Sequence, residues 1–366
     1  MQIPSKPHVA VVAASLDLLG GQGVQAQSLI EGLRGDGYRV TFVPINPAFP
    51  RGARWIRRVR GLRTCLNEPL YLAALTRLMS ADVVHVFSAS YWSFLLAPVP
   101  AMTVARAMNK RVVLHYHSGE ADDHLANWGP LVHPWLGLAH EIVVPSEYLH
   151  EVFVQHGYAT RVVPNVVDVS AFGYRERRPL RPRVLSTRNL EPYYRVDLVI
   201  EAFARFRAEV PDARLTIAGY GSEESRLRDQ AGVLLGDAVR FVGKIPPWAI
   251  PRLYAAHDMY VNASVLDNQP VSILEAFAAG LPVVTSAIGD ITAMARHGEM
   301  ALLVPPSDSM ALADAMTAIW RAPGEARRRA ACARMHVANY TWPAVRKRWA
   351  AIYSGHADGD AISVVA

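Results

Sequence analysis

The sequence has little of what marks several specialised protein classes. Two cysteines, Cys65 and Cys332, occur in 366 residues, so a disulfide framework is not expected. The small number of cysteines fits a reducing, cytoplasmic location. The apolar run near the N-terminus is too short for a signal peptide and is predicted to be a first strand. Charged residues make up only 19% and apolar residues 51% of the chain. This composition indicates a soluble globular protein, and the length predicts two domains.

The longest stretch without Lys, Arg, Asp or Glu covers residues 83–105. Its length would suffice to cross a membrane. The stretch contains His85, three serines and two prolines, however, and it divides into a strand followed by a helix. We therefore predict no membrane span here.

Acidic residues are absent from residues 51–63, RGARWIRRVRGLR, which hold six arginines. Apolar side chains such as Trp55 and Ile56 are interleaved with them. This pattern predicts peripheral attachment to an anionic membrane surface, on its inner face, or contact with an acidic ligand. A solvated basic face would give the same pattern. No recognition module accompanies the run, so nucleic acid is not an expected partner.

A complete dinucleotide-binding fingerprint is also missing. Glycines Gly20, Gly21 and Gly23 lie between a predicted strand, 9–13, and a predicted helix, 24–33. The fingerprint requires G-x-G-x-x-G and an acidic residue after the next strand. That strand is followed by Asn46, so a nicotinamide-dependent dehydrogenase is disfavoured.

The most informative stretch is VNASVLDNQPVSILEAFAAGLPVVTSAIGDITAMARHGEMALLVPPSD, residues 261–308. A predicted strand, 259–262, leads through a loop with Asp267 into a helix that carries Glu275 and ends at Gly280. A second strand, 282–285, completes a βαβ unit. Ligands of such units bind beyond the carboxyl ends of the strands. The free amides at the start of the helix suit a phosphate group.

The spacing of Asp267 and Glu275 resembles the E-x7-E signature of retaining GT-B glycosyltransferases of family four, the glycosyl transferases group 1. The resemblance implies that Glu275 holds the ribose hydroxyls of a nucleotide and that Asp267 holds the hydroxyls of its sugar. A surface loop in which the aspartate caps a helix would produce the same residues.

Further segments extend the resemblance over most of the chain. VVPNVVDVSAF, 162–172, is similar to the PNGVD segment of that family, and VLSTRNLEPYYRVDLVIEAF, 184–203, to its G-R-L-x-x-x-K-G segment. Arg188 occupies the place of the phosphate-binding arginine. Tyr194 stands where the family has a lysine, and Arg195 follows it. A missing cation matters because the leaving diphosphate needs its charge neutralised.

The resemblance also implies the other residues that bind the donor. Gly20 and Gly21 face the phosphates, Gly219 belongs to a glycine turn, and the nucleotide base rests on main chain near Lys244. Pro270 replaces a residue whose amide would contact the sugar, and proline has no such amide. The implied donor-binding set is Gly20, Gly21, Arg195, Gly219, Lys244, Asn268, Gln269, Val271, Ser272 and Glu275.

Two histidines end the predicted strand 111–115, in LHYHSGEADDH. The resemblance implies that one contacts the donor sugar near the reacting carbon. We assign this role to His117, with His115 as the second choice, and predict that the two rings lie on opposite sides of the strand. Packing in the core would explain either residue. The neighbouring acids fit no zinc spacing, so no metal is expected.

The resemblance implies an α/β protein with the GT-B fold: two Rossmann-like domains facing across a cleft, with a C-terminal helix that crosses back to the first. We predict domains at 1–172 and 173–339, and the crossing helix and tail at 340–366. The implied activity is retaining transfer of a sugar from a UDP- or GDP-linked donor to a glycan, lipid-linked or small-molecule acceptor, without a cofactor. His117, Arg188 and Asp267 form the predicted catalytic set. A sugar-nucleotide epimerase or hydrolase on the same fold, or a non-catalytic binding homologue, are the alternatives.

Overall fold

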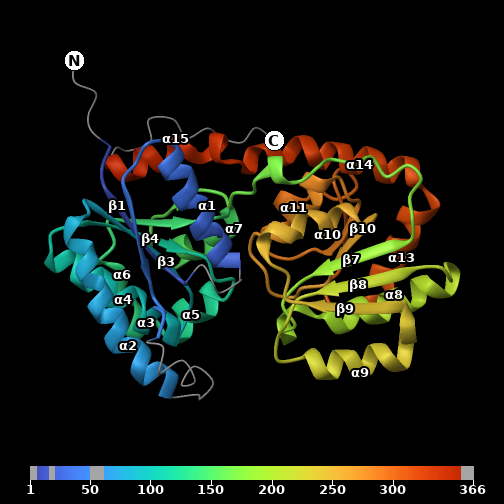
Figure 1. The fold of residues 1–366 in the computed structure, drawn as a ribbon, viewed down its shortest axis with the longest axis horizontal. Coiled ribbons are helices and arrows are strands. Elements are labelled where there is room, and N and C mark those ends of the chain that lie inside the picture. The colour runs from blue at the N-terminus through green and yellow to red at the C-terminus, as the bar shows by residue number, and fades with distance from the viewer. Residues whose placement is uncertain (1–5, 16–20, 50–61, 356–366) are drawn as a thin grey trace. The chain divides into compact units, whose positions relative to one another are not determined.

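The computed structural model describes residues 6–15, 21–49 and 62–355 (Figure 1). The chain forms two compact units. Unit 1 consists of Met1–Val166 together with Trp342–Ala366, and unit 2 of Val167–Thr341. Unit 2 begins a few residues before the predicted boundary at Gly173.

Unit 1 is built on a six-stranded, fully parallel sheet in the order β2-β1-β3-β4-β5-β6. Parallel strands covered by helices on both faces are apolar along their whole length rather than at alternate residues. The buried sequence VAVVA of β1 is an example. The strands are β1 Val9–Ala13, β2 Val40–Pro44, β3 Val83–Ser88, β4 Arg111–Tyr116, β5 Glu141–Val144 and β6 Arg161–Val162.

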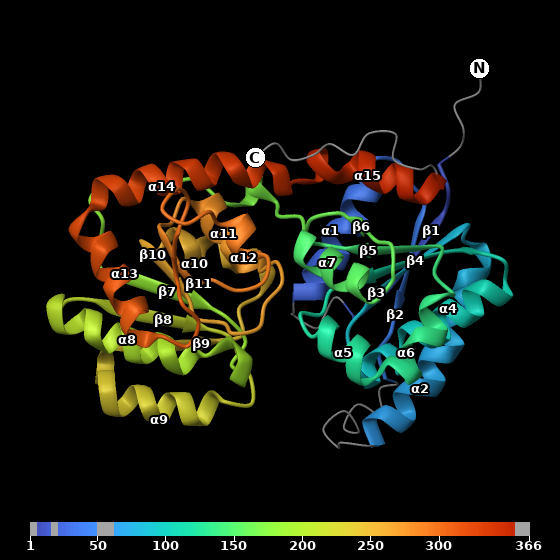
Figure 2. The ribbon, with the colours of Figure 1, turned by 180° about the vertical axis from the view of Figure 1, so that it is seen from behind.

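The helices of unit 1 follow the strands in alternation (Figure 2). The uncharged stretch 83–105 is divided among β3, α3 and α4, so a strand is followed by two helices where one was predicted. No helix in the described part of the chain has the length and apolar character needed to cross a membrane. The helices are α1 Gly21–Gly35, α2 Leu62–Ala74, α3 Trp92–Leu96, α4 Pro98–Ala107, α5 Ala121–Asn127, α6 Gly129–Leu136 and α7 Glu147–Gln155.

The last helix, α15 (Trp342–Ser354), belongs to unit 1, so the predicted return of the chain to the first domain is confirmed. Trp342 lies directly over Gly32 of α1, where a Cβ atom would come within 2.2 Å of the indole ring. The indole nitrogen donates a hydrogen bond to Asp36 at 3.1 Å. The hydroxyl of Tyr353, about three turns further on, is 2.9 Å from the buried ring of His85 on β3.

Unit 2 has a second parallel sheet of six strands, in the order β12-β11-β10-β7-β8-β9. Its core is made by the apolar faces of α8, α11, α13 and α14 packed on the sheet. The strands are β7 Arg183–Thr187, β8 Arg214–Ala218, β9 Val239–Gly243, β10 Met259–Asn262, β11 Val283–Ser286 and β12 Leu302–Val304. The helices are α8 Val196–Glu209, α9 Glu224–Leu235, α10 Ile250–Ala255, α11 Val271–Ala279, α12 Ile291–Met294, α13 Ser309–Arg321 and α14 Pro323–His336.

The strand order of unit 2 reverses at β7. The chain proceeds from β7 outward to β8 and β9, then returns to place β10 on the other side of β7. The loops that leave the carboxyl ends of β7 and β10 therefore diverge to opposite faces of the sheet. In open α/β sheets, the crevice at such a reversal is where ligands bind.

Candidate functional site

Residues from both loops at this reversal meet in unit 2. Arg188 follows β7 directly, and Asp267 lies in the loop between β10 and α11. The guanidinium of Arg188 forms an ion pair with Asp267 and donates a hydrogen bond to the Ser272 hydroxyl at 3.0 Å. These residues are more than 75 positions apart in the sequence, and the topology of the sheet brings them together.

The Arg188 side chain is largely withdrawn from water, with 9% of its surface exposed against 12% for Asp267. The ring of Tyr194 lies 4.1 Å from the centre of the guanidinium, a cation–π contact. Although burial opposes the charge, the Asp267 carboxylate raises the pKa of Arg188, so the arginine is a permanent cation. Its Nε has no hydrogen-bond partner among the described residues.

Glu275 joins the same cluster from the second turn of α11. Burial raises the pKa of Glu275 to about 7, while the neighbouring Tyr254 hydroxyl and the charge of Arg188 act in the opposite direction. The Tyr254 hydroxyl is 2.7 Å from Thr187 and donates to the Ser272 carbonyl at 3.0 Å. This hydroxyl therefore links the end of β7 to the start of α11.

A glycine turn after β8 closes one side of the cluster. A Cβ atom at Gly219 would lie 1.9 Å from the Arg188 carbonyl oxygen, and one at Gly221 would lie 2.3 Å from the Leu190 carbonyl oxygen. Only glycine allows this turn to approach the segment after β7 so closely. On the far side of the turn, the Lys244 ammonium is 5.4 Å from the ring of Tyr220. Of the predicted positions, Gly219 thus borders the segment that carries Arg188, and Lys244 contacts the glycine turn at Tyr220.

The loop between β10 and α11 is held by its own polar contacts. The Gln269 amide donates to Asp290 at 2.9 Å, and the Asn268 backbone N–H donates to Asp267 at 3.2 Å. Pro270 precedes the helix in an extended conformation without a side-chain cap. The Ile273 amide donates to the Pro270 carbonyl at 3.1 Å, so the Val271 and Ser272 amides are the ones left for other acceptors.

Arg195 is engaged elsewhere. Its guanidinium forms an ion pair with Asp197 at 3.1 Å and donates to the Ser307 hydroxyl at 3.3 Å. Its backbone is left-handed, with φ of 46°. Tyr194, not Arg195, is the side chain that contacts Arg188.

His117 lies in unit 1, just after β4. Its ring is 4.0 Å from that of His115 and is stacked on Phe87 at 5.1 Å. The prediction that the two histidines lie on opposite sides of the strand is wrong, because residues two positions apart in a strand share a face. Burial lowers the pKa of His117 to about 3, so the ring is neutral near pH 7. Its Nε2 has no partner among the described residues.

Comparisons with known proteins agree on one family. The sequence profile of "Glycosyl transferases group 1" matches residues 175–334, and that of "Glycosyltransferase Family 4" matches residues 19–171. Glycogen synthase of Mycobacterium tuberculosis is 30% identical over 291 residues, covering 74% of this chain and 68% of that protein. The chain belongs to the glycosyl transferases group 1 family. It is a glycosyltransferase.

The glycosyltransferase is also similar to other named enzymes and to solved structures. A phosphatidyl-myo-inositol mannosyltransferase of Mycobacterium leprae is 30% identical over 197 residues, about half of each chain. Among solved structures, HepE of Anabaena in complex with UDP superposes with a TM-score of 0.72 at 18% identity, covering 95% of this chain and all of that one. Sucrose-phosphate synthase of Thermosynechococcus elongatus gives 0.74 at 21% identity, covering 96% and 99%. These similarities confirm the predicted GT-B fold.

Some predicted positions of the glycosyltransferase lie outside the described residues. They are Gly20 and most of the arginine-rich run, from 51 to 61. Gly21 is described and begins α1, three residues earlier than the predicted helix start. No group of three or more His, Cys, Asp or Glu side chains that could hold a metal ion occurs in the described part of the chain.

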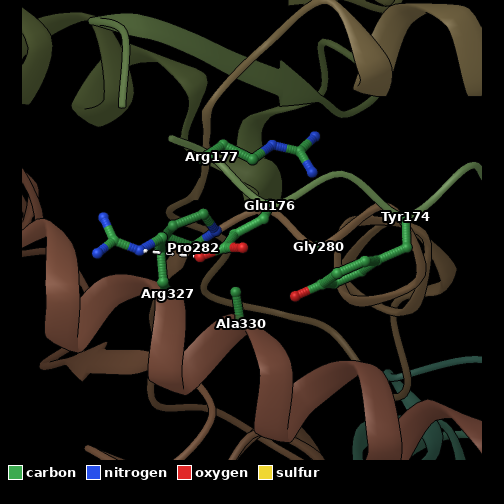
Figure 3. A pocket seen from close by; sticks show the side chains of 7 residues that line it. All are labelled: Tyr174, Glu176, Arg177, Gly280, Pro282, Arg327 and Ala330. Carbon is green, nitrogen blue, oxygen red and sulfur yellow. Dashed lines mark ion pairs between the residues drawn. The ribbon is translucent and has the colours of Figure 1, made fainter. Parts of the chain in front are cut away.

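A shallow surface hollow lies elsewhere in unit 2 (Figure 3). Arg177 beside it is 1% exposed and donates to the Tyr254 carbonyl at 3.2 Å, so the arginine-rich segment before β7 packs into unit 2. Pro282 precedes β11, which places the hollow at the amino end of the sheet, opposite the Arg188 cluster. Its lining residues are Tyr174, Glu176, Arg177, Gly280, Pro282, Arg327 and Ala330.

The sequence did not indicate the aromatic residues around the cluster. Tyr254 lies on α10 and Tyr260 on β10, both fully buried. Buried tyrosines ordinarily pack in a core, and nothing in their local sequence separates these two from that role. Only the three-dimensional contacts show that Tyr254 bonds to the cluster.

Proposed function

We propose that this glycosyltransferase transfers a hexose or similar sugar from a UDP- or GDP-linked donor to an acceptor hydroxyl, with retention of the anomeric configuration. The observation that carries the proposal is the convergence of Arg188, Asp267, Ser272 and Glu275 at the strand-order reversal of unit 2. One buried cation and the open amides of a helix N-terminus suit a diphosphate. Two carboxylates beside them suit the hydroxyls of ribose and sugar.

In this proposal each residue has a distinct part. Arg188 and the first amides of α11, at Val271 and Ser272, hold the diphosphate. Glu275 accepts hydrogen bonds from the ribose hydroxyls, and Asp267 does so from the sugar. Asn268 and Gln269 shape the loop beside the sugar, and Gly219, Gly20 and Gly21 allow the main chain to approach the donor.

The catalytic effect would be mainly electrostatic. Charge accumulates on the diphosphate as its bond to the sugar breaks, and a cation held in a water-poor site stabilises that charge without having to reorganise. Asp267 balances the charge of Arg188 in their ion pair. The diphosphate would therefore compete with Asp267 for the guanidinium and release the carboxylate toward the sugar.

The acceptor is proposed more broadly. HepE was solved with UDP, and the curated relatives include a glycogen synthase and a lipid mannosyltransferase. A glycan or a lipid-linked sugar is thus the class of acceptor that we propose. The arginine-rich run 51–63 would bring the enzyme to the inner face of an anionic membrane.

The test compares Arg188 with Arg195, the other arginine that the sequence predicted to bind the donor. Calorimetric titration with UDP and GDP should show that Arg188→Met loses most of the affinity, while Arg195→Met retains it, because Asp197 already neutralises Arg195. The double variant Arg188→Met/Asp267→Asn controls for the carboxylate that the single variant leaves buried without its partner. Equal binding by wild type and both Arg188 variants would refute the diphosphate role. Loss in Arg195→Met as well would mean that Arg195 supplies the second charge.

Separate measurements test whether the anomeric configuration is retained and whether the sugar is transferred to an acceptor. Proton NMR of the first product formed reports the configuration at the anomeric carbon before any mutarotation. Consumption of the donor at the same rate with and without acceptor would show a hydrolase instead of a transferase.

A further inference from the structure

At the carboxyl edge of its sheet, unit 1 carries an exposed tryptophan, Trp92, beside two half-buried aromatic side chains, Tyr91 and Trp128. Trp92 begins α3, four residues after β3, and is 64% exposed. Its ring centroid is 5.4 Å from that of Trp128, which ends α5, and the two planes are nearly perpendicular at 89°. Tyr91 meets the same Trp128 ring at 5.4 Å. We refer to Tyr91, Trp92 and Trp128 as the aromatic platform.

The platform is held in place at a conformational cost. Tyr91 has φ of 57° and ψ of −133°, an unfavourable backbone for a residue with a side chain. Its hydroxyl donates a hydrogen bond to Asp123 at 2.5 Å, and the Asn127 amide donates to the same carboxylate at 2.7 Å. Such strain persists where surrounding contacts enforce it, and it concentrates at functional sites.

A buried polar chain lies behind the platform. His124 is fully buried, and its Nδ1 is 2.8 Å from the Tyr116 hydroxyl, which is 2.8 Å from the Ser90 hydroxyl. The other ring nitrogen of His124 has no partner among the described residues. The His124 ring also meets the Tyr91 ring at 5.2 Å. The polar chain therefore fixes the position of Tyr91 from behind.

The chemistry of this surface selects its ligand. The exposed Trp92 indole, with the half-buried Trp128 beside it, favours a ligand with an apolar face that leaves water on binding. Asp123 and the neighbouring acids Glu120 and Asp122 supply acceptors for hydroxyl groups and would repel an anionic surface. A ring with one face of C–H groups and a rim of hydroxyls satisfies both requirements. That description fits a neutral sugar and does not fit an acidic lipid headgroup.

We infer that the aromatic platform is a subsite for a neutral sugar ring of the acceptor. The inference rests on the proposed transferase function, and it narrows the acceptor to a glycan or to the neutral glycan part of a glycolipid. Trp92 stacks on the ring, Trp128 supports Trp92 from the side, and Asp123 accepts hydrogen bonds from the sugar hydroxyls while holding Tyr91.

The experiment uses an array of neutral, uronic-acid-containing and sulfated oligosaccharides, probed with the full-length protein. Wild type should be retained by neutral oligosaccharides. Trp92→Ala should weaken that retention about tenfold, equivalent to about 1.4 kcal/mol, and Trp92→Phe should restore part of it. Trp248→Ala is the matched control, since Trp248 is 78% exposed and belongs to unit 2. It should bind as wild type does.

Three results would overturn the inference. They are a wild type that retains no neutral oligosaccharide, a preference for the acidic ones, or equal retention by Trp92→Ala. Thermal shift with UDP and GDP on the same variants separates this inference from the donor proposal. Trp92→Ala should keep the wild-type shift, and a wild type without any nucleotide shift would count against the donor site alone.

Discussion

Ionisation of Glu275 should destabilise the folded protein as the pH rises. Burial raises the pKa of this carboxyl from 4.5 to about 7. Between these two values the folded state keeps the proton and the unfolded state does not. The free energy of unfolding then falls by about 1.36 kcal/mol for each pH unit. Over the whole interval the loss is about 3 kcal/mol, fully present above pH 7 and absent below pH 4.5.

The substitution Glu275→Gln removes this ionisation and keeps the shape of the side chain. The variant should match wild type near pH 4.5 and exceed its stability by up to about 3 kcal/mol at pH 8. The assay is urea denaturation of both proteins at pH 5, 6, 7 and 8, followed by circular dichroism. Glu224→Gln, which removes a surface carboxylate paired with Arg228, is the control and should leave the pH dependence unchanged. A stability difference between Glu275→Gln and wild type that does not vary with pH would refute the argument.

The remaining predictions concern the donor and the membrane. Asp267→Asn should change the affinity for free UDP or GDP, measured by calorimetry, by less than about threefold, and should lower the transfer rate far more, because the residue is proposed to touch only the sugar. Equal losses of affinity and transfer would show that Asp267 contacts the nucleotide. Tyr194→Lys should tighten nucleotide binding by roughly three- to tenfold, since it adds a second cation beside Arg188. Tyr193→Lys, the control at the neighbouring position, should not tighten binding, and unchanged affinity in Tyr194→Lys would contradict the prediction. In flotation assays wild type should rise with anionic liposomes, not with neutral ones, and be released by salt. Changing the four arginines between 54 and 60 to Gln should abolish flotation, and a wild type that stays in the soluble fraction would end the membrane proposal.

Much of the fold followed from the apolar runs. The β10 strand was predicted at its observed bounds, and the end of α11 at Gly280 was correct because a left-handed glycine there closes the helix at φ of 75°. The proximity of Arg188 and Asp267 was also within reach of the sequence. Both follow strands that parallel α/β topology places at one edge of a sheet.

The details of the site that depend on side-chain direction could not be predicted from the sequence. The contact of Tyr194 with Arg188 requires the exact path of the chain after β7. Arg195 points to Asp197 because its backbone is left-handed, a conformation that sequence alone rarely indicates for arginine. The side on which His115 and His117 lie was predictable from the two-residue period of a strand, and our assignment was an error of reasoning rather than of information.

The return of α15 to unit 1 affects how the protein is made. Residues that receive this helix, such as Gly32 and His85, leave the ribosome before all of unit 2 has been synthesised. At a synthesis rate of about 5 to 20 residues per second, the surface that α15 covers stays exposed for on the order of ten to thirty seconds before α15 is synthesised. Unit 2 is one continuous segment and can fold during that wait. The first domain to emerge is therefore the last to be completed, and its apolar face is the part of the nascent chain most in need of protection by a chaperone.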